Sequence, residues 1–168
     1  MRVMGIDPGT VAAGFGVVES VGSSLRPVAY GVLRPARGLP YVDRLLAMYR
    51  GLVEAIGQYR PSAVAVEEGF FGKSVRSAMK LGEGRAVALL SGAQSGLPVT
   101  TYAPAVVKKA VVGSGTADKS QVQEMVKCLL GLKEAAPEDA SDALAVAICH
   151  CHRVGHEEMF KHAERRRR

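Results

Sequence analysis

The chain has 168 residues, a formal net charge of +6 at pH 7 and a hydrophobic content of 48%. This length and composition favour one globular domain with a single core. The apolar runs are far shorter than the roughly 20 residues that a membrane-spanning helix needs, and Asp7 interrupts the first run where a signal peptide would continue. We therefore expect a cytoplasmic protein that is not embedded in a membrane.

The basic surplus lies in the body of the chain. Residues 60–119 carry eight basic and four acidic side chains, whereas residues 120–168 carry eight of each, although residues 165–168 are all arginine. A basic surplus is compatible with a polyanionic partner but does not identify one.

Cysteine usage excludes a disulfide scaffold, because the three cysteines have no framework spacing. The run Cys149-His150-Cys151-His152 has the residue types of a zinc site. In a helix, however, only Cys149 and His152 would share a face, and two ligands are too few for structural zinc. We expect these side chains to pack or to be solvated.

The first 60 residues predict three strands and a helix. Apolar runs followed by turn residues predict strands over 2–6, 13–21 and 25–33, the last two joined as a hairpin around Gly22. Apolar residues at helical spacing then predict a helix over 40–59, which Pro61 ends.

The remaining chain alternates strands with helices. Strands are expected over 63–66 and 99–102, and helices over 74–93, 118–130 and 137–153. Asp118 and Gln121 have the spacing of a capping box. Residues 106–112 stay ambiguous, because their β-branched side chains favour a strand and their neighbours favour a helix.

This order predicts an α/β fold, with a mixed five-stranded sheet whose first three strands are antiparallel and with helices on both faces. We assign residues 1–153 to this domain. Residues 154–168 contain few apolar side chains and are expected to form a flexible basic tail.

Four carboxylates stand where they can form a site. Asp7 and Glu67 directly follow runs expected to be central strands, at the sheet edge where α/β folds bind ligands. Asp139 and Asp142 lie on one face of the last predicted helix. Three of the acids have a simpler reading: a turn residue for Asp7, a solvated acid for Glu67 and a favourable first-turn charge for Asp139. Asp142 is harder to explain in this way, because its neighbours on the helix are apolar.

Taken together, these carboxylates suit two divalent cations. Hard oxygen ligands fit Mg²⁺ or Mn²⁺. In such a site one ion activates water and the other stabilises the leaving oxygen of a phosphodiester.

Six short segments follow one another along the chain: Gly5-Ile6-Asp7-Pro8-Gly9, Val66-Glu67, Ser77-Ala78-Met79-Lys80-Leu81-Gly82, Val111-Val112-Gly113, Lys119-Ser120-Gln121-Val122-Gln123 and Asp139-Ala140-Ser141-Asp142-Ala143-Leu144-Ala145. In this order they resemble the RuvC-type crossover junction endodeoxyribonucleases (Holliday-junction resolvases) of the ribonuclease H-like superfamily. They span residues 3 to about 152.

The resemblance implies a ribonuclease H-like fold and a homodimeric endonuclease that uses two Mg²⁺ ions per active site, with Mn²⁺ able to substitute. Such an enzyme nicks a four-way DNA junction symmetrically, in homologous recombination and DNA repair, alongside a branch-migration helicase complex of the RuvA and RuvB type. By motif position, the catalytic and metal-binding residues are Asp7, Glu67, Asp139 and Asp142.

The resemblance also implies residues that bind DNA. These are Phe70, Phe71, Lys73, Arg76, Lys80, Lys108 and Lys119. The aromatic pair could instead be core, and the cations of 73–85, including Arg85, could be a solvated helix face. Lys119 falls in a first helical turn, where the dipole disfavours a cation and an external anion would explain it. The second acid, Glu68, could contact metal or water.

Two alternatives remain open. A junction-binding module of the same fold with weak or no catalysis would need the same surface. The run Asp7-Pro8-Gly9-Thr10 also resembles the phosphate loop of actin-like and sugar-kinase ATPases, but those proteins need two such lobes around the nucleotide.

Overall fold

The computed structural model describes the backbone of residues 1–69 and 75–165, and the side chains of these residues as far as 157. Within this part the strands are β1 (Arg2–Asp7), β2 (Ala13–Val21), β3 (Ser24–Leu33), β4 (Ala63–Glu67) and β5 (Val99–Tyr102). The helices are α1 (Tyr41–Tyr59), α2 (Val75–Gln94), α3 (Pro104–Val112), α4 (Lys119–Leu130) and α5 (Glu138–Arg165).

The strands form one mixed sheet in the order β3-β2-β1-β4-β5. β2 pairs antiparallel with both β1 and β3, whereas β4 runs parallel to β1 and β5. The predicted sheet, with three antiparallel strands followed by parallel ones, is therefore confirmed.

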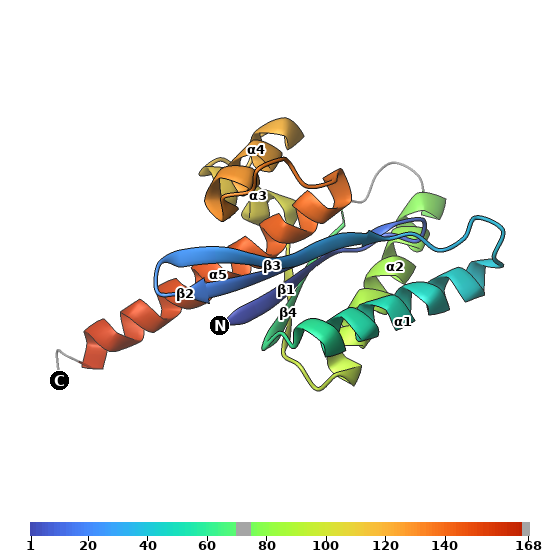
Figure 1. Cartoon of the computed structure of the whole chain (residues 1–168), viewed down its shortest axis with the longest axis horizontal. Helices are drawn as coiled ribbons and strands as arrows, with labels where there is room; N and C mark the ends of the chain where they lie inside the picture. Colours follow the sequence, from blue (N-terminus) through green and yellow to red (C-terminus); the bar gives the residue numbers. More distant parts are fainter. Residues whose placement is uncertain (70–74, 166–168) are drawn as a thin grey trace.

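Helices cover both faces of the sheet, as predicted (Figure 1). Alternation along β1 divides the core: Met4 and Ile6 pack with residues of α1 and α2, whereas Val3 packs with residues of α3, α4 and α5. Such alternation is what a strand with two buried faces requires.

Helix α5 lies directly on the sheet because glycines face it. A Cβ on Gly5 would collide with the carbonyl oxygen of Ala143, and one on Gly14 with that of Asp139. The helix contributes small buried residues such as Ala140 and Ala147 to this contact. The close approach places the first turn of α5 beside the carboxyl end of β1.

The structure resolves one ambiguous segment and corrects one element boundary. Residues 106–112 belong to helix α3, which Pro104 opens and which buries Val107 and Val111 one turn apart. The predicted end of the last helix at residue 153 is wrong, because α5 continues to Arg165. An ion pair of Arg153 with Glu157, one turn on, supports this continuation. The division between residues 1–153 and 154–168 stays a prediction.

The Cys-His run packs against neighbouring elements. Cys149 and His152 both face α3, through the carbonyl oxygens of Val106 and Ala110. Nδ1 of His150 forms a hydrogen bond of 2.9 Å with the Tyr102 hydroxyl inside the core, and Cys151 is buried. Among the described residues, no helix is long and apolar enough to cross a membrane.

Candidate active site

Asp7 and Glu67 lie at the same edge of the sheet. β1 and β4 are parallel, with Ile6 paired to Val66, so the next residue of each strand reaches the same level. The backbone of Glu68 then donates a hydrogen bond to the carbonyl of Tyr102. The sheet therefore holds both carboxylates side by side on neighbouring rigid strands.

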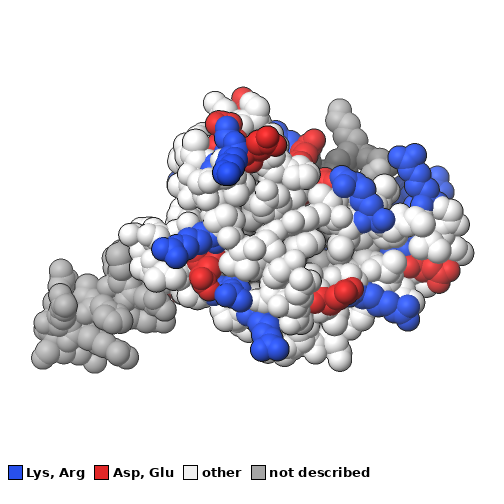
Figure 2. All heavy atoms as spheres, viewed as in Figure 1, with Lys and Arg blue, Asp and Glu red and all other residues white. Residues whose placement is uncertain are grey.

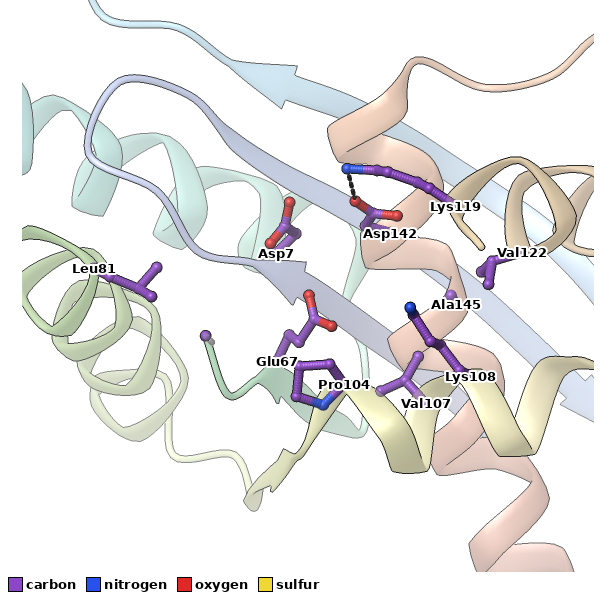
Figure 3. A pocket seen from close by; sticks show the side chains of 11 residues that line it. Asp7, Glu67, Leu81, Pro104, Val107, Lys108, Lys119, Val122, Asp142 and Ala145 are labelled. Atoms are coloured by element: carbon purple, nitrogen blue, oxygen red, sulfur yellow. Dashed lines mark ion pairs between the residues drawn. The ribbon is translucent and has the colours of Figure 1, made fainter. Parts of the chain in front are cut away.

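Helix α5 brings a third carboxylate to this edge. Asp7, Glu67 and Asp142 line one cavity of about 330 Å³, together with Lys108 of α3 and Lys119 of α4. Figure 3 shows the three carboxylates directed toward a common space, with the two lysines at its border. Three segments that are far apart in the sequence thus converge as predicted.

Lys119 is held by acids of α5. Its Nζ lies 2.8 Å from Asp142 and 2.6 Å from Glu138. Partial burial acts to lower its pKa, but the hydrogen bonds to Asp142 and Glu138 outweigh burial and raise it. These internal anions account for a cation in the first turn of α4, where the dipole alone would disfavour it. The capping box of Asp118 and Gln121 that starts this helix is confirmed.

Asp139 lies near the other acids but does not line the cavity. Its Oδ2 is 3.2 Å from Nη2 of Arg34, the residue that follows β3. Its charge nevertheless acts on the pKa of both Asp7 and Asp142. The structure therefore groups Asp7, Glu67 and Asp142 at the cavity and holds Asp139 beside them.

The site has a shortage of positive charge. Burial, followed by the charges of Glu67, Asp142 and Asp139, raises the pKa of Asp7 to about 8 against the opposing effect of Lys119. Burial, together with the charge of Asp142, raises the pKa of Glu67 to about 7 against the opposing effect of Lys119. The pKa of Asp142 is also raised by burial, although Lys119 opposes this.

The chemistry of this donor set fits divalent cations. Buried carboxylates whose pKa values are raised gain from a cation that restores their charged form, and carboxylate oxygens are the ligands of Mg²⁺ and Mn²⁺. In the part of the chain that the structure describes, no three Asp, Glu, His or Cys side chains already stand in metal-ligand geometry. Asp142 and Asp139 are each engaged in an ion pair, with Lys119 and Arg34 respectively, which a bound cation would have to replace.

The residues predicted to bind DNA divide into three groups. Lys108 and Lys119 line the cavity. Arg76 and Lys80 are exposed on α2 and are not among the residues that line it. Phe70, Phe71 and Lys73 lie outside the described residues.

Arg34, Glu138 and Thr101 were not singled out in the sequence. Arg34 and Glu138 form ion pairs with site residues, and the hydroxyl of Thr101 donates to Glu68 at 2.6 Å. Glu138 could have been found from its place beside Asp139 in a first helical turn. No local signal marks Arg34 or Thr101, because their partners are brought to them by the sheet and by α5.

A mixed sheet in this strand order, with acids at the ends of β1 and β4 and in the first turn of a helix packed across it, defines a ribonuclease H-like protein with a nuclease-type carboxylate site. Comparison with known proteins gives the family. The family model described as crossover junction endodeoxyribonuclease RuvC matches residues 3–150.

Individual relatives agree with this match. The chain is 50% identical to the crossover junction endodeoxyribonuclease RuvC of Pelotomaculum thermopropionicum, over 96% of this chain and 99% of that protein. It is 52% identical to the RuvC of Chloroflexus aggregans, over 90% of this chain and 93% of that one. The structure of Thermus thermophilus RuvC in complex with a Holliday junction substrate superposes with a TM-score of 0.87 at 37% identity, covering 94% and 96% of the two chains.

The chain therefore belongs to the RuvC family of crossover junction endodeoxyribonucleases. The predicted family and the predicted ribonuclease H-like fold are confirmed, and the chain is classed with metal-dependent endonucleases that hydrolyse DNA.

Proposed function

We propose that this chain resolves four-way (Holliday) DNA junctions by paired, symmetric nicks, in homologous recombination and DNA repair. The observation that carries the proposal is the convergence of Asp7, Glu67 and Asp142 on one cavity bordered by Lys108 and Lys119. A cavity with partly buried acids on one side and lysines at its border suits a phosphodiester that is held by metal ions at the acids and by the ammonium groups of the lysines.

Asp7, Glu67, Asp139 and Asp142 are the residues that would hold two Mg²⁺ ions, with Mn²⁺ able to replace them. Bound there, such ions supply an activated water and stabilise the leaving oxygen of the phosphodiester. Asp7 and Glu67 are fixed by the sheet and orient the site. Lys119, released from Asp142, and Lys108 would contact the phosphate.

The partners follow from the symmetry of the substrate. A four-way junction with two equivalent strands presents two equivalent phosphodiesters, so a homodimer with two-fold symmetry places one site at each.

We infer a branch-migration helicase complex of the RuvA and RuvB type as a further partner. Since the matched relatives come from bacteria, we place the activity in the bacterial cytoplasm, at the nucleoid. The residues Phe70, Phe71, Lys73, Arg76 and Lys80 remain proposed DNA contacts.

Junction cleavage with mapped nick positions tests this proposal. With Mg²⁺ the purified chain should nick a synthetic four-way junction at paired, symmetric positions and leave linear duplex of the same sequence intact. EDTA should abolish cleavage, and Mn²⁺ should restore it. Cleavage that is equal on linear duplex, or that persists in EDTA, would contradict the proposal.

The same experiment decides between the alternatives. Tight junction binding without cleavage in either metal would identify a binding module. The match of the family model to residues 3–150 as one unit argues against an ATPase lobe built on Asp7-Pro8-Gly9-Thr10.

A further inference from the structure

A second cavity adjoins the active-site cavity. It has a volume of about 440 Å³ and is lined by Glu68, Gly69, Leu81, Gly82, Arg85, Ala103 and Pro104. We call it the side cavity. Its volume lies within the range of about 300–1,000 Å³ that small-molecule and cofactor sites occupy.

Most of the lining is apolar, and two charged groups stand at one wall. Leu81, Ala103 and Pro104 provide apolar surface, whereas Glu68 and Arg85 are the charged residues among the lining ones. Apolar walls with a few convergent polar groups are typical of a site for a flat, heteroaromatic ligand. The walls can pack against the ring, while the polar groups face its edge.

Glu68 is held in a fixed position. Its backbone N–H donates to the carbonyl of Tyr102 at 2.8 Å, which extends the β4–β5 pairing by one residue. Its Oε1 accepts from the Thr101 hydroxyl at 2.6 Å. A carboxylate fixed in this way keeps its second oxygen available as an acceptor.

Arg85 brings a donor to the same wall. Its Nη2 is 3.8 Å from Oε1 of Glu68, which is an ion pair but longer than a hydrogen bond. Its Nε is buried and has no hydrogen-bond partner among the described residues. The Arg85 side chain as a whole is about one-third exposed, so the terminal N–H groups of its guanidinium are the donors that a ligand in the side cavity can reach.

The side cavity and the active-site cavity share part of their walls. Gly69, Leu81 and Pro104 line both cavities, and Figure 3 labels Leu81 of α2 and Pro104 of α3 at the border of the active-site cavity. Glu68 is also the neighbour of Glu67 in the chain. A nucleotide whose phosphate lies against Asp7 and Glu67 therefore has its sugar and base within reach of the side cavity.

We infer that the side cavity binds an unpaired nucleobase of the cleaved strand, next to the scissile phosphate, and that Glu68 and Arg85 read the edge of that base. Glu68 accepts from an N–H group of the base, and Arg85 donates to a carbonyl oxygen or ring nitrogen. Each such pairing discriminates between bases. This inference rests on the proposed function and assigns part of its sequence selectivity to these two residues.

The test combines a substitution in the protein with a change of one base in the junction, each made alone and both made together. Cleavage rates are measured for a set of junctions that carry each of the four bases, or an abasic residue, at every position flanking the nick. Glu68→Gln exchanges an acceptor-only group for one that also donates. It should change the rate ratio between bases at one position by about 5- to 100-fold, and the abasic residue there should abolish the difference between the variant and the wild type.

A cavity-filling variant gives a second, independent readout. A Cβ on Gly82 meets nothing within 4 Å, so Gly82→Met can extend into the side cavity without displacing the described backbone. Gly57 of α1 has the same open surroundings but lies outside the cavity. Gly82→Met should reduce the differences in cleavage rate between bases at the position that Glu68→Gln identifies. Gly57→Met should leave the wild-type rate ratios unchanged.

A purely structural role of Glu68 and Arg85 predicts a different result, in which all junctions are cleaved more slowly by the same factor. If wild type, Glu68→Gln and Gly82→Met have the same relative cleavage rates for the four bases at every position, the inference is overturned while the proposed function stands. If the wild type cleaves no junction, the proposed function fails. Competition binding of the same junctions in EDTA then tests the base preference alone, and equal preferences in all variants would overturn the inference.

Discussion

Asp7 is a buried carboxylate whose neighbours are mostly other carboxylates. Lys119 is the cation that acts on its pKa, and it is shared with Asp142 and Glu138. The charged form of Asp7 therefore costs free energy in the metal-free protein. This arrangement exchanges stability for function, as expected of a site built to receive cations.

The stability of the metal-free protein should depend on pH through Asp7. Its pKa is raised from 3.8 to about 8 in the folded chain, so below 3.8 the side chain is protonated whether the chain is folded or not. Between these values the folded chain holds a proton that the unfolded chain releases. Asp7 thus costs stability increasingly as pH rises from 3.8, and the cost is complete above about pH 8.

Asp7→Asn should remove this cost and the activity together. At pH 8.5 in EDTA we expect the free energy of unfolding to rise by about 1–2 kcal/mol, or about 3–8 °C in Tm for a chain of this length. The gain should fall toward zero near pH 4. Junction cleavage should drop below about 1% of wild type, because a proposed metal ligand is lost.

Thermal melts at several pH values, with and without Mg²⁺, check this prediction. Mg²⁺ should raise the Tm of the wild type at pH 8.5 and should have a much smaller effect on Asp7→Asn. Glu54→Gln is the matched control, because it neutralises an exposed carboxylate on α1. A stability gain that is the same at pH 4 as at pH 8.5 would contradict the assignment to Asp7.

At the scale of elements, the contact between α5 and the sheet positions the acids of the helix. Gly14 is paired with Asp7 across β1 and β2, and its Cα faces the carbonyl of Asp139. Any side chain at this position would push the first turn of α5 away from the sheet. The glycine is required for space, because its backbone is not in the left-handed region.

Gly14→Ala should therefore destabilise the protein and weaken the site. We expect a loss of about 1–3 kcal/mol from overpacking and a weaker Tm response to Mg²⁺, since Asp139 and Asp142 move with the helix. Gly57→Ala, at an open position of α1, should be neutral or slightly stabilising. Equal melting curves for Gly14→Ala and wild type would show that α5 does not lie this close to β2.

The elements differ in how far the sequence predicts them. Strands β1 and β4 are continuous apolar runs ended by an acid, so their place in the centre of the sheet and the convergence of Asp7 and Glu67 follow from local patterns. Helix α3 was ambiguous because Val107 and Val111 suit either structure, and only packing against α5 decides it.

Long-range pairs mark the limit of such prediction. The ion pair of Arg34 with Asp139 joins the residue after β3 to the first turn of α5, and it depends on where β3 ends and on how closely α5 approaches. No spacing in the sequence encodes it. The same holds for the hydrogen bond of Thr101 to Glu68, which requires the register of β4 with β5.

At the scale of the whole molecule, the chain carries a formal net charge of +6 at pH 7. Figure 2 shows Lys and Arg side chains dispersed over one face, with Asp and Glu side chains between them. Three acids of the site, by contrast, line a cavity and are partly buried. On this face, the separate cationic side chains suit a large polyanionic substrate that contacts several of them at once.

Junction binding should therefore weaken steeply with salt. A plot of log K against log[NaCl], measured in EDTA so that no strand is cut, should be linear, with a slope of about −0.9 for each phosphate contact on duplex DNA. Lys108 borders the active-site cavity, so Lys108→Ala should make the slope shallower by about 0.9. Arg50→Ala removes the same charge from an exposed position of α1, on the other face of the sheet, and should leave the slope unchanged. Because both variants lose one positive charge, a slope that changes equally in the two would mean that net charge alone governs binding, and Lys108 would then have no direct phosphate contact.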